Sequence, residues 1–213
     1  MAAGGVVYSS RMNPSSPRSF ASTDPGPEQA PAVASTLVED QLAYIAGTIR
    51  NIPDFPKPGI QFKDITPLLA DAQGLGTTLD LLQARASLLR PSRIVGIESR
   101  GFVFGVPLAD RMGLGFAPVR KPGKLPHKVA RGEYLLEYGS GVLELHEDAV
   151  AGHKVLIVDD LLATGGTAAC AAELCQRLGG QVVGYLFVIE LAALGGRARL
   201  GAEPRVVQSL LTY

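Results

Sequence analysis

The distribution of apolar residues predicts alternating strands and helices over the second half of the chain. Residues 101–112 and 164–178 carry apolar side chains at helical spacing. Around them lie short segments that are nearly all apolar, as buried strands are: residues 93–98, 115–120, 154–160, 181–189 and 206–211. Apolar strands that alternate with helices predict an α/β fold, in which a parallel sheet is flanked by helices on both faces.

A different pattern, between two of these strands, predicts a β-hairpin. Apolar and polar residues alternate in residues 134–137 and again in residues 142–146. A Gly-Ser-Gly turn separates the two runs. Alternating runs on either side of a short glycine turn are typical of paired antiparallel strands.

The first half of the chain carries weaker patterns. We expect a helix over residues 36–50, because Thr36 and Glu39 have the spacing of a capping box and apolar residues follow at helical spacing. Several prolines then predict an irregular connection, with a short extended piece at residues 60–65. Residues 74–89 form a second predicted helix.

Residues 1–35 differ from the rest of the chain in composition. They are rich in Ser, Pro, Ala and Gly and show no sustained periodicity, which predicts a disordered tail before a domain spanning residues 36–213. Two arginines and no acidic residue precede Asp24, so an organelle transit peptide is an alternative. A third possibility is an upstream start, with Met12 as a second initiation site.

Charge and composition narrow the function classes. The chain has 213 residues, of which 20 are Lys or Arg and 20 are Asp or Glu, so its formal net charge is zero. This balance argues against a dedicated nucleic-acid-binding protein but leaves room for a local basic site that binds a small anion. No apolar run approaches the roughly 20 residues that span a bilayer.

Two cysteines, Cys170 and Cys175, lie five residues apart on one predicted helix. Neighbours on a helix face are about three or four residues apart, so a disulfide between them is geometrically poor. We interpret both as buried reduced thiols, which is typical of a cytoplasmic protein.

The most informative segment is residues 155–167, a buried strand followed by a loop and a helix start. The strand ends in two adjacent carboxylates, Asp159 and Asp160, and the loop has the sequence Thr-Gly-Gly-Thr. The first backbone N–H groups of a helix bind anions, glycines let the backbone approach the anion closely, and phosphate is the obvious candidate. A strand end with a helix cap would not explain both the acids and the loop.

The two acids need a partner other than the phosphate, which they would repel. Vicinal ribose hydroxyls, or a magnesium ion on a polyphosphate, would suit them. The usual glycine-rich nucleotide motifs are absent from the sequence. The segment therefore predicts a sugar-phosphate site at the carboxyl edge of the sheet.

This segment resembles the signature of the type I phosphoribosyltransferases. Five flanking segments resemble the adenine branch of that family: residues 54–60, 62–65, 98–102, 119–126 and 136–139. The resemblance covers about residues 38–213. It implies the type I phosphoribosyltransferase fold, with a small hood and a flexible lid hairpin beside the parallel sheet, and a homodimer.

The resemblance also implies a reaction in purine salvage. Adenine and phosphoribosyl pyrophosphate would give AMP and pyrophosphate, in a reversible transfer in the cytoplasm. Mg²⁺ would be carried by the substrate, with no metal ligands supplied by the protein alone.

Residue roles follow from the matched motifs. Asp159 and Asp160 would bind the ribose hydroxyls, and the 5-phosphate would lie on Ala163, Thr164, Gly165, Gly166 and Thr167. The pyrophosphate would be bound by Glu98, Ser99, Arg100 and Gly101, where the family commonly has a non-proline cis peptide, and by Arg120, Lys121 and Lys124. In the family, one of these basic residues can reach the neighbouring subunit's site.

The adenine site would lie beside the sugar. Phe62 and Leu161 would stack on the two faces of the ring, and the main chain of Gln61 to Lys63 would bind the exocyclic amine. Ala163 stands where the hypoxanthine–guanine relatives have an acid near the purine N7, which weakens an oxopurine assignment. Glu137, in the hairpin, would instead give N7 its proton, and Arg100 would neutralise the leaving pyrophosphate; these two are the expected catalytic residues.

Two other functions stay open from the sequence. A regulator that senses phosphoribosyl pyrophosphate could use this fold, but it would need an appended DNA-binding domain and a basic face, and neither is evident. A transferase for another base, such as xanthine, would share the phosphoribosyl motifs.

Overall fold

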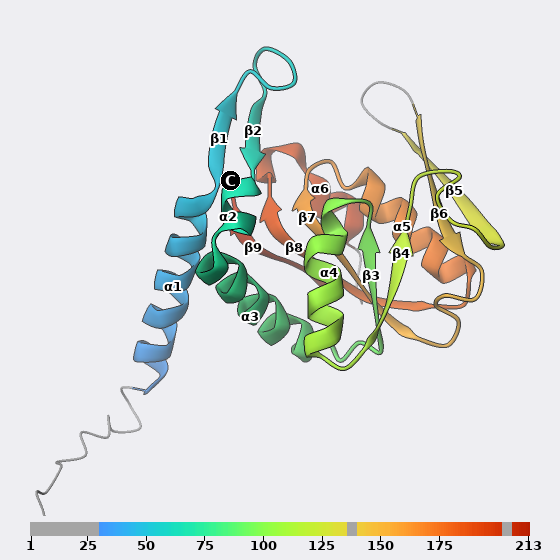
Figure 1. The fold of residues 1–213 in the computed structure, drawn as a ribbon, viewed down its shortest axis with the longest axis horizontal. Helices are drawn as coiled ribbons and strands as arrows, with labels where there is room; N and C mark the ends of the chain where they lie inside the picture. Colours follow the sequence, from blue (N-terminus) through green and yellow to red (C-terminus); the bar gives the residue numbers. More distant parts are fainter. Residues whose placement is uncertain (1–29, 136–139, 202–205) are drawn as a thin grey trace, which may run out of the picture. The chain divides into compact units, whose positions relative to one another are not determined.

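A computed structural model of the protein describes residues 30–135, 140–201 and 206–213 (Figure 1). Contacts between Cα atoms divide the chain into two units, residues 1–37 and 38–213. Of the predicted tail, residues 1–35, the first 29 residues lie outside the described residues, so their disorder stays a prediction. The prediction was wrong for residues 30–35, which are helical. No helix in the described ranges is long and apolar enough to cross a membrane.

The predicted parallel sheet is confirmed. In the described part of the chain its strands are β3 (Arg93–Ile97), β4 (Gly115–Val119), β7 (Lys154–Leu162), β8 (Gln181–Glu190) and β9 (Val206–Thr212). They are all parallel and lie in the order β4-β3-β7-β8-β9. Each strand lies within two residues of its predicted bounds, because a strand buried on both faces must be almost entirely apolar.

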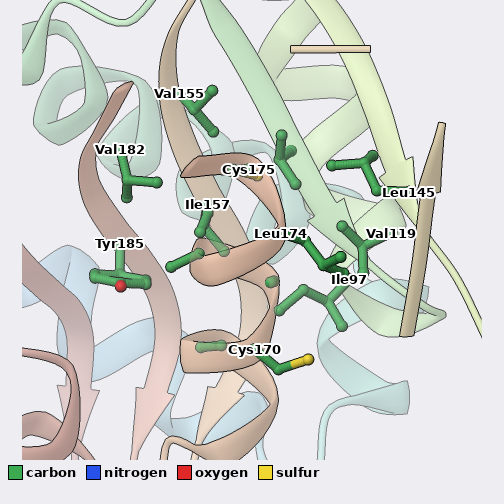
Figure 2. Close-up of a cluster of buried hydrophobic side chains, with 14 of the residues drawn as sticks. Ile97, Val119, Leu145, Val155, Ile157, Cys170, Leu174, Cys175, Val182 and Tyr185 are labelled. Atoms are coloured by element: carbon green, nitrogen blue, oxygen red, sulfur yellow. The ribbon is translucent and has the colours of Figure 1, made fainter. Parts of the chain in front are cut away.

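Successive residues of the central strand β7 pack on opposite faces of the sheet. Leu156 and Val158 belong to a core cluster with helices α3 (Ala72–Leu89) and α4 (Arg100–Arg111). Val155 and Ile157 belong to a second cluster, on the side of helix α5 (Gly166–Arg177) (Figure 2). Burial of each such side chain is worth about 1.5–3 kcal/mol, so both faces fix the carboxyl end of β7.

The predicted hairpin is present, and its first strand begins earlier than expected. Strand β5 (Val129–Leu135) pairs antiparallel with β6 (Ser140–His146). The main chain of β6 also bonds to the end of β4, since Arg120 N donates to Glu144 O at 2.9 Å and Glu144 N donates to Arg120 O at 2.7 Å. Residues 136–139, which include Glu137, lie outside the described residues.

The capping-box prediction was wrong. Helix α1 spans Ala30–Thr48, so Thr36 lies inside the helix instead of starting it. The segment before Thr36 is rich in alanine, the strongest helix former, so it extends the helix without a capping signal.

The connection predicted as irregular contains a small antiparallel pair, the predicted hood. Strand β1 (Arg50–Pro53) pairs with β2 (Gln61–Asp64), and the short helix α2 (Thr66–Ala70) follows (Figure 1). Strand β2 confirms the extended piece predicted at residues 60–65. Strand β1 was not predicted, because a four-residue strand offers too few positions for alternation to be seen in the sequence. The elements η1 (Ala192–Leu194) and α6 (Gly196–Leu200), which follow β8, were also not predicted.

Candidate active site

A cavity of about 270 Å³ lies at the carboxyl ends of β3 and β7. Most of the residues predicted for the sugar and pyrophosphate sites line it together: Glu98, Ser99, Arg100, Asp159, Asp160, Ala163, Thr164, Gly165, Gly166 and Thr167. Parallel strands end at one edge, so segments 60 residues apart in sequence meet there. Tyr134 of β5 also lines the cavity and was not predicted, because its alternation in the hairpin resembles that of any strand residue.

The Thr-Gly-Gly-Thr loop leads into helix α5 in a conformation suited to an anion. Gly165 is the N-cap residue and has a φ of 77°, a left-handed conformation that favours glycine. No side chain caps the helix, so its first N–H groups are open to a ligand. Since α5 packs on the core through residues such as Cys170 and Leu174, the anion site is held by buried structure (Figure 2).

The paired acids lie beneath this loop. Asp160 is 2% exposed, and Asp159 Oδ1 accepts a hydrogen bond from the Asp160 backbone N–H at 2.9 Å. Arg100 Nε lies 3.1 Å from Asp160 Oδ2, an ion-pair distance without the alignment of a hydrogen bond. One buried carboxylate oxygen therefore has room for a further partner.

Burial makes both acids hard to ionise. It raises the pKa of Asp159 well above the ordinary value, and the neighbouring charge of Asp160 raises that pKa further. Burial also raises the pKa of Asp160, although the guanidinium of Arg100 opposes the shift. Hydroxyl donors or a divalent cation would stabilise this pair of charges.

The turn from β3 into α4 brings the predicted pyrophosphate residues to the cavity. The peptide bond between Glu98 and Ser99 is cis, which confirms the expectation from the resemblance. Gly101 packs directly on the main chain of β7, since a Cβ there would lie 2.6 Å from Val158 O. Only glycine fits at this crossing, and it places Arg100 over the acids.

The basic loop, residues 120–124, is held by two carboxylates. Glu98 Oε2 accepts from Lys121 N at 2.9 Å and from Arg120 Nε at 3.2 Å. These hydrogen bonds, the one from Lys121 N first, lower the pKa of Glu98. Glu144, only 1% exposed, accepts from Gly123 N at 2.9 Å. Sequence reasoning missed Glu144, because a glutamate between leucines in a hairpin gives no sign of burial.

Three of the predicted adenine residues, Gln61, Phe62 and Lys63, lie on β2 and do not line the cavity. The fourth, Leu161, lies on β7 and lines it. The Phe62 ring packs edge-to-face on Phe55, with centroids 5.1 Å apart. The Arg100 Cζ atom lies 5.8 Å from the centroid of the Phe62 ring, so Phe62 borders the site. Lys63 Nζ instead donates to Asn51 Oδ1 at 2.7 Å and lies over the Tyr213 ring.

Comparisons with known proteins agree with this geometry. A family model described as "Phosphoribosyl transferase domain" matches residues 89–205. The chain is 56% identical over 172 residues to an adenine phosphoribosyltransferase of Crocosphaera subtropica, an alignment that covers 79% of this chain and 99% of the relative. The chain belongs to the adenine phosphoribosyltransferase family. The sequence resemblance is thereby confirmed.

Solved structures of adenine phosphoribosyltransferases share the fold. That from Thermoanaerobacter pseudethanolicus has a TM-score of 0.77 at 48% identity, covering 81% of this chain and 99% of that chain. That from Saccharomyces cerevisiae, solved with adenine and an imino-altritol bisphosphate, has a TM-score of 0.75 at 39% identity, covering 81% and 99%. The type I phosphoribosyltransferase fold is therefore established for this member of the family.

Three groups of predicted residues differ in how the structure places them. The sugar-phosphate residues converge on one cavity, while the predicted pyrophosphate residues Gly101, Arg120, Lys121 and Lys124 are not among the residues that line it. Glu137, the expected proton donor of the adenine phosphoribosyltransferase reaction, lies outside the described residues. No described cluster holds three or more His, Cys, Asp or Glu side chains that could bind a metal ion.

Proposed function

We propose that this chain transfers the 5-phosphoribosyl group of phosphoribosyl pyrophosphate to adenine, giving AMP and pyrophosphate in purine salvage. The observation that carries this proposal is the convergence of Arg100, Asp160 and the Thr-Gly-Gly-Thr loop on one cavity. The same cavity thus offers donors for a phosphate and acceptors for ribose hydroxyls, as the family's reaction requires.

The sugar phosphate would lie with its 5-phosphate on Ala163 to Thr167 and its ribose hydroxyls on Asp159 and Asp160. Backbone N–H groups at the start of α5 donate to the phosphate oxygens. The acids accept from the hydroxyls, which offsets the cost of burying two charges. Binding at both ends would hold the anomeric carbon in place. The chain would then accelerate the reaction mainly by positioning this carbon for attack by the base.

The pyrophosphate would leave toward the cis turn and the basic loop. Arg100 and Lys121 would neutralise its charge as the bond at the anomeric carbon breaks. Glu98, whose side chain anchors Arg120 and Lys121 N, would orient that loop. Mg²⁺ would enter with the substrate, and the buried Asp160 Oδ2 atom, which lacks an aligned donor, supports a role in receiving hydroxyls or the cation.

Adenine would stack between Phe62 and Leu161, with the main chain of Gln61 to Lys63 binding its exocyclic amine. The place of Phe62 beside Arg100 supports this assignment, as does the yeast relative solved with adenine. Glu137 would donate a proton to N7 as the glycosidic bond forms, a role that typically contributes about 10²- to 10⁴-fold to the rate.

Two finer features belong to the same proposal. The chain would act as a homodimer, supported by Val103 and Val106 on α4, which are 39% and 49% exposed. It would work in the cytoplasm, supported by Cys170 and Cys175, which are free and buried.

The test is a base titration with Mg²⁺ and phosphoribosyl pyrophosphate. AMP should form with adenine, while hypoxanthine, guanine and xanthine should give at least about 100-fold less product, because buried groups paired with one base are left unpaired by another. Binding of the activated sugar without turnover of any base would favour the regulator. Turnover of xanthine in preference to adenine would favour the other-base transferase.

A further inference from the structure

The loop that follows β8 packs main chain against main chain on the phosphate loop. A Cβ on Gly196 would lie 2.1 Å from Ala163 O. In the other direction, a Cβ on Gly165 would lie 2.7 Å from Gly196 O. Two glycines thus let the loops touch without any side chain between them. The position of the phosphate loop therefore depends on the position of Gly196.

The residue after Gly196 fixes that position. Arg197 donates from Nε to Glu190 Oε1 at 2.9 Å, and from Nη2 to Glu190 Oε2. Its Nη1 donates to Val207 O at 2.5 Å, so one guanidinium joins the last residue of β8 to the start of β9. Ser209 Oγ donates to Glu190 Oε2 at 2.7 Å. Glu190 is 5% exposed, and a buried carboxylate paired by a two-pronged guanidinium holds its partner in one orientation.

We propose that Arg197 is a positioning residue for the 5-phosphate loop, acting through Gly196 on Ala163 and Gly165. Arg197 is not among the residues that line the cavity. Its ion pair with Glu190 holds the main chain of Gly196 against the loop. This contact keeps Ala163 to Gly165 from moving away from the phosphate. The inference rests on the proposed function, since it takes this loop as the 5-phosphate site.

Burial of the Glu190 carboxylate distinguishes this ion pair from an ordinary ion pair at the protein surface. An exposed ion pair contributes little to stability, but the Glu190 carboxylate is buried. Strands β8 and β9 are already joined by main-chain pairing, from Gly184 opposite Val206 to Glu190 opposite Thr212. The guanidinium is therefore not needed to pair β8 with β9. What it fixes instead is the position of the segment that carries Gly196.

The experiment compares three variants with two matched controls. Gly196→Ala adds a methyl group against Ala163 O, and Gly76→Ala adds one in helix α3, where a Cβ meets nothing within 4 Å. Arg197→Lys keeps the charge without the two-pronged geometry, and Arg197→Ala removes both. Arg199→Ala removes an exposed arginine from the same short helix. Calorimetry then gives Kd values for ribose 5-phosphate and for Mg²⁺-pyrophosphate separately, beside KM and kcat.

We expect Gly196→Ala to weaken ribose 5-phosphate binding by about 100-fold, because a displacement of about 1 Å can cost that much. Arg197→Ala should weaken ribose 5-phosphate binding by about tenfold. Arg197→Lys should weaken it less, because lysine keeps an ion pair with Glu190. Affinity for Mg²⁺-pyrophosphate and KM for adenine should stay within about twofold of wild type, a change of less than 0.5 kcal/mol. Both controls should match wild type.

Two results would overturn the inference. If Gly196→Ala and Arg197→Lys bind ribose 5-phosphate as wild type does, the loop does not depend on this anchor. If all three ligands weaken together, with melting temperature falling in proportion, the residues stabilise the fold and nothing more. Failure of the proposed function itself would look different, because wild type would then bind no ribose 5-phosphate and form no AMP. If Arg197→Ala does not fold, the ribose 5-phosphate affinities of Gly196→Ala and Arg197→Lys still test the inference.

Discussion

The two regions proposed to bind the anionic groups of the substrate are held in different ways. The Thr-Gly-Gly-Thr loop joins β7 to α5, both of which contribute side chains to the buried core (Figure 2). The loop also contacts Gly196 through main-chain atoms. The basic loop, residues 120–124, follows the edge strand β4 and is held by side-chain oxygens of Glu98 and Glu144. The first region is fixed by main-chain packing on both sides. The second has main-chain bonds to β6 at Arg120 alone, and beyond that residue the hydrogen bonds described for its N–H groups are accepted by two carboxylates.

This difference matches the tasks that the proposed function gives to the two regions. There the 5-phosphate would stay bound through the reaction, so a preformed backbone site would suit it. The pyrophosphate would leave, and a loop that depends on a small number of side-chain contacts could adjust during the cycle. The comparison predicts that damage to either region affects one ligand and spares the other.

Gly165→Val should have the largest effect. A branched side chain cannot readily adopt a φ of 77°, and its Cβ would meet Gly196 O at 2.7 Å. We expect the KM for phosphoribosyl pyrophosphate to rise by about 100-fold or more, as for a displacement of about 1 Å. Steady-state kinetics check this, with circular dichroism to show that the fold is retained. A KM within about twofold of wild type would remove the loop from the site.

Phe62→Ala tests whether the base site is independent of both anion regions. Loss of the stacking contact between the Phe62 ring and the base should weaken adenine binding by about 1–3 kcal/mol. The Kd for ribose 5-phosphate should stay unchanged, since Phe62 lies on β2 in the hood. Titration calorimetry with each ligand measures both. Equal losses for the two ligands would show instead that Phe62 supports the site as packing.

Glu144→Ala tests the side-chain anchoring of the basic loop. It removes the acceptor for Gly123 N, and a hydrogen bond to a charged group is worth about 1.5–3 kcal/mol. We expect affinity for Mg²⁺-pyrophosphate to fall by about tenfold and that for ribose 5-phosphate to hold, again by calorimetry. Arg131→Ala is the control, because it removes the ion pair with Glu144 Oε1 but leaves the Gly123 contact. Similar losses in the two variants would contradict the assigned role of the Gly123 bond.

Asp159→Asn should have the smallest effect of these substitutions. We expect its melting temperature to rise by about 2–4 °C, which corresponds to roughly 1 kcal/mol of stability for a chain of this size. The pKa of Asp159 is raised in the folded protein, chiefly by burial, so its ionised form disfavours folding. The cost is absent below about pH 4, where the carboxyl is protonated in both states, and grows as pH rises through the raised pKa. Melting curves across pH check this. A gain that is the same at all pH values would contradict it.

Sequence reasoning succeeded where one pattern determines one structure. The continuous apolar runs of β7 and β8 leave no alternative to a buried strand, and the Thr-Gly-Gly-Thr loop could be placed because a helix start must follow it. Glu144 and Glu190 could not be predicted, since their partners lie on other segments of the chain. Both are buried acids whose roles depend on tertiary pairing that no local spacing encodes.

The central claim is that the 5-phosphate binds on the loop from Ala163 to Thr167 and that this loop is preformed. A crystal structure with AMP and Mg²⁺-pyrophosphate tests it most directly. We predict phosphate oxygens within hydrogen-bond distance of the backbone N–H groups of Thr164 to Thr167, with Cα shifts in this loop below about 1 Å and larger shifts in residues 120–124. A 5-phosphate bound on the basic loop, or a larger displacement of residues 163–167 than of residues 120–124, would contradict the account.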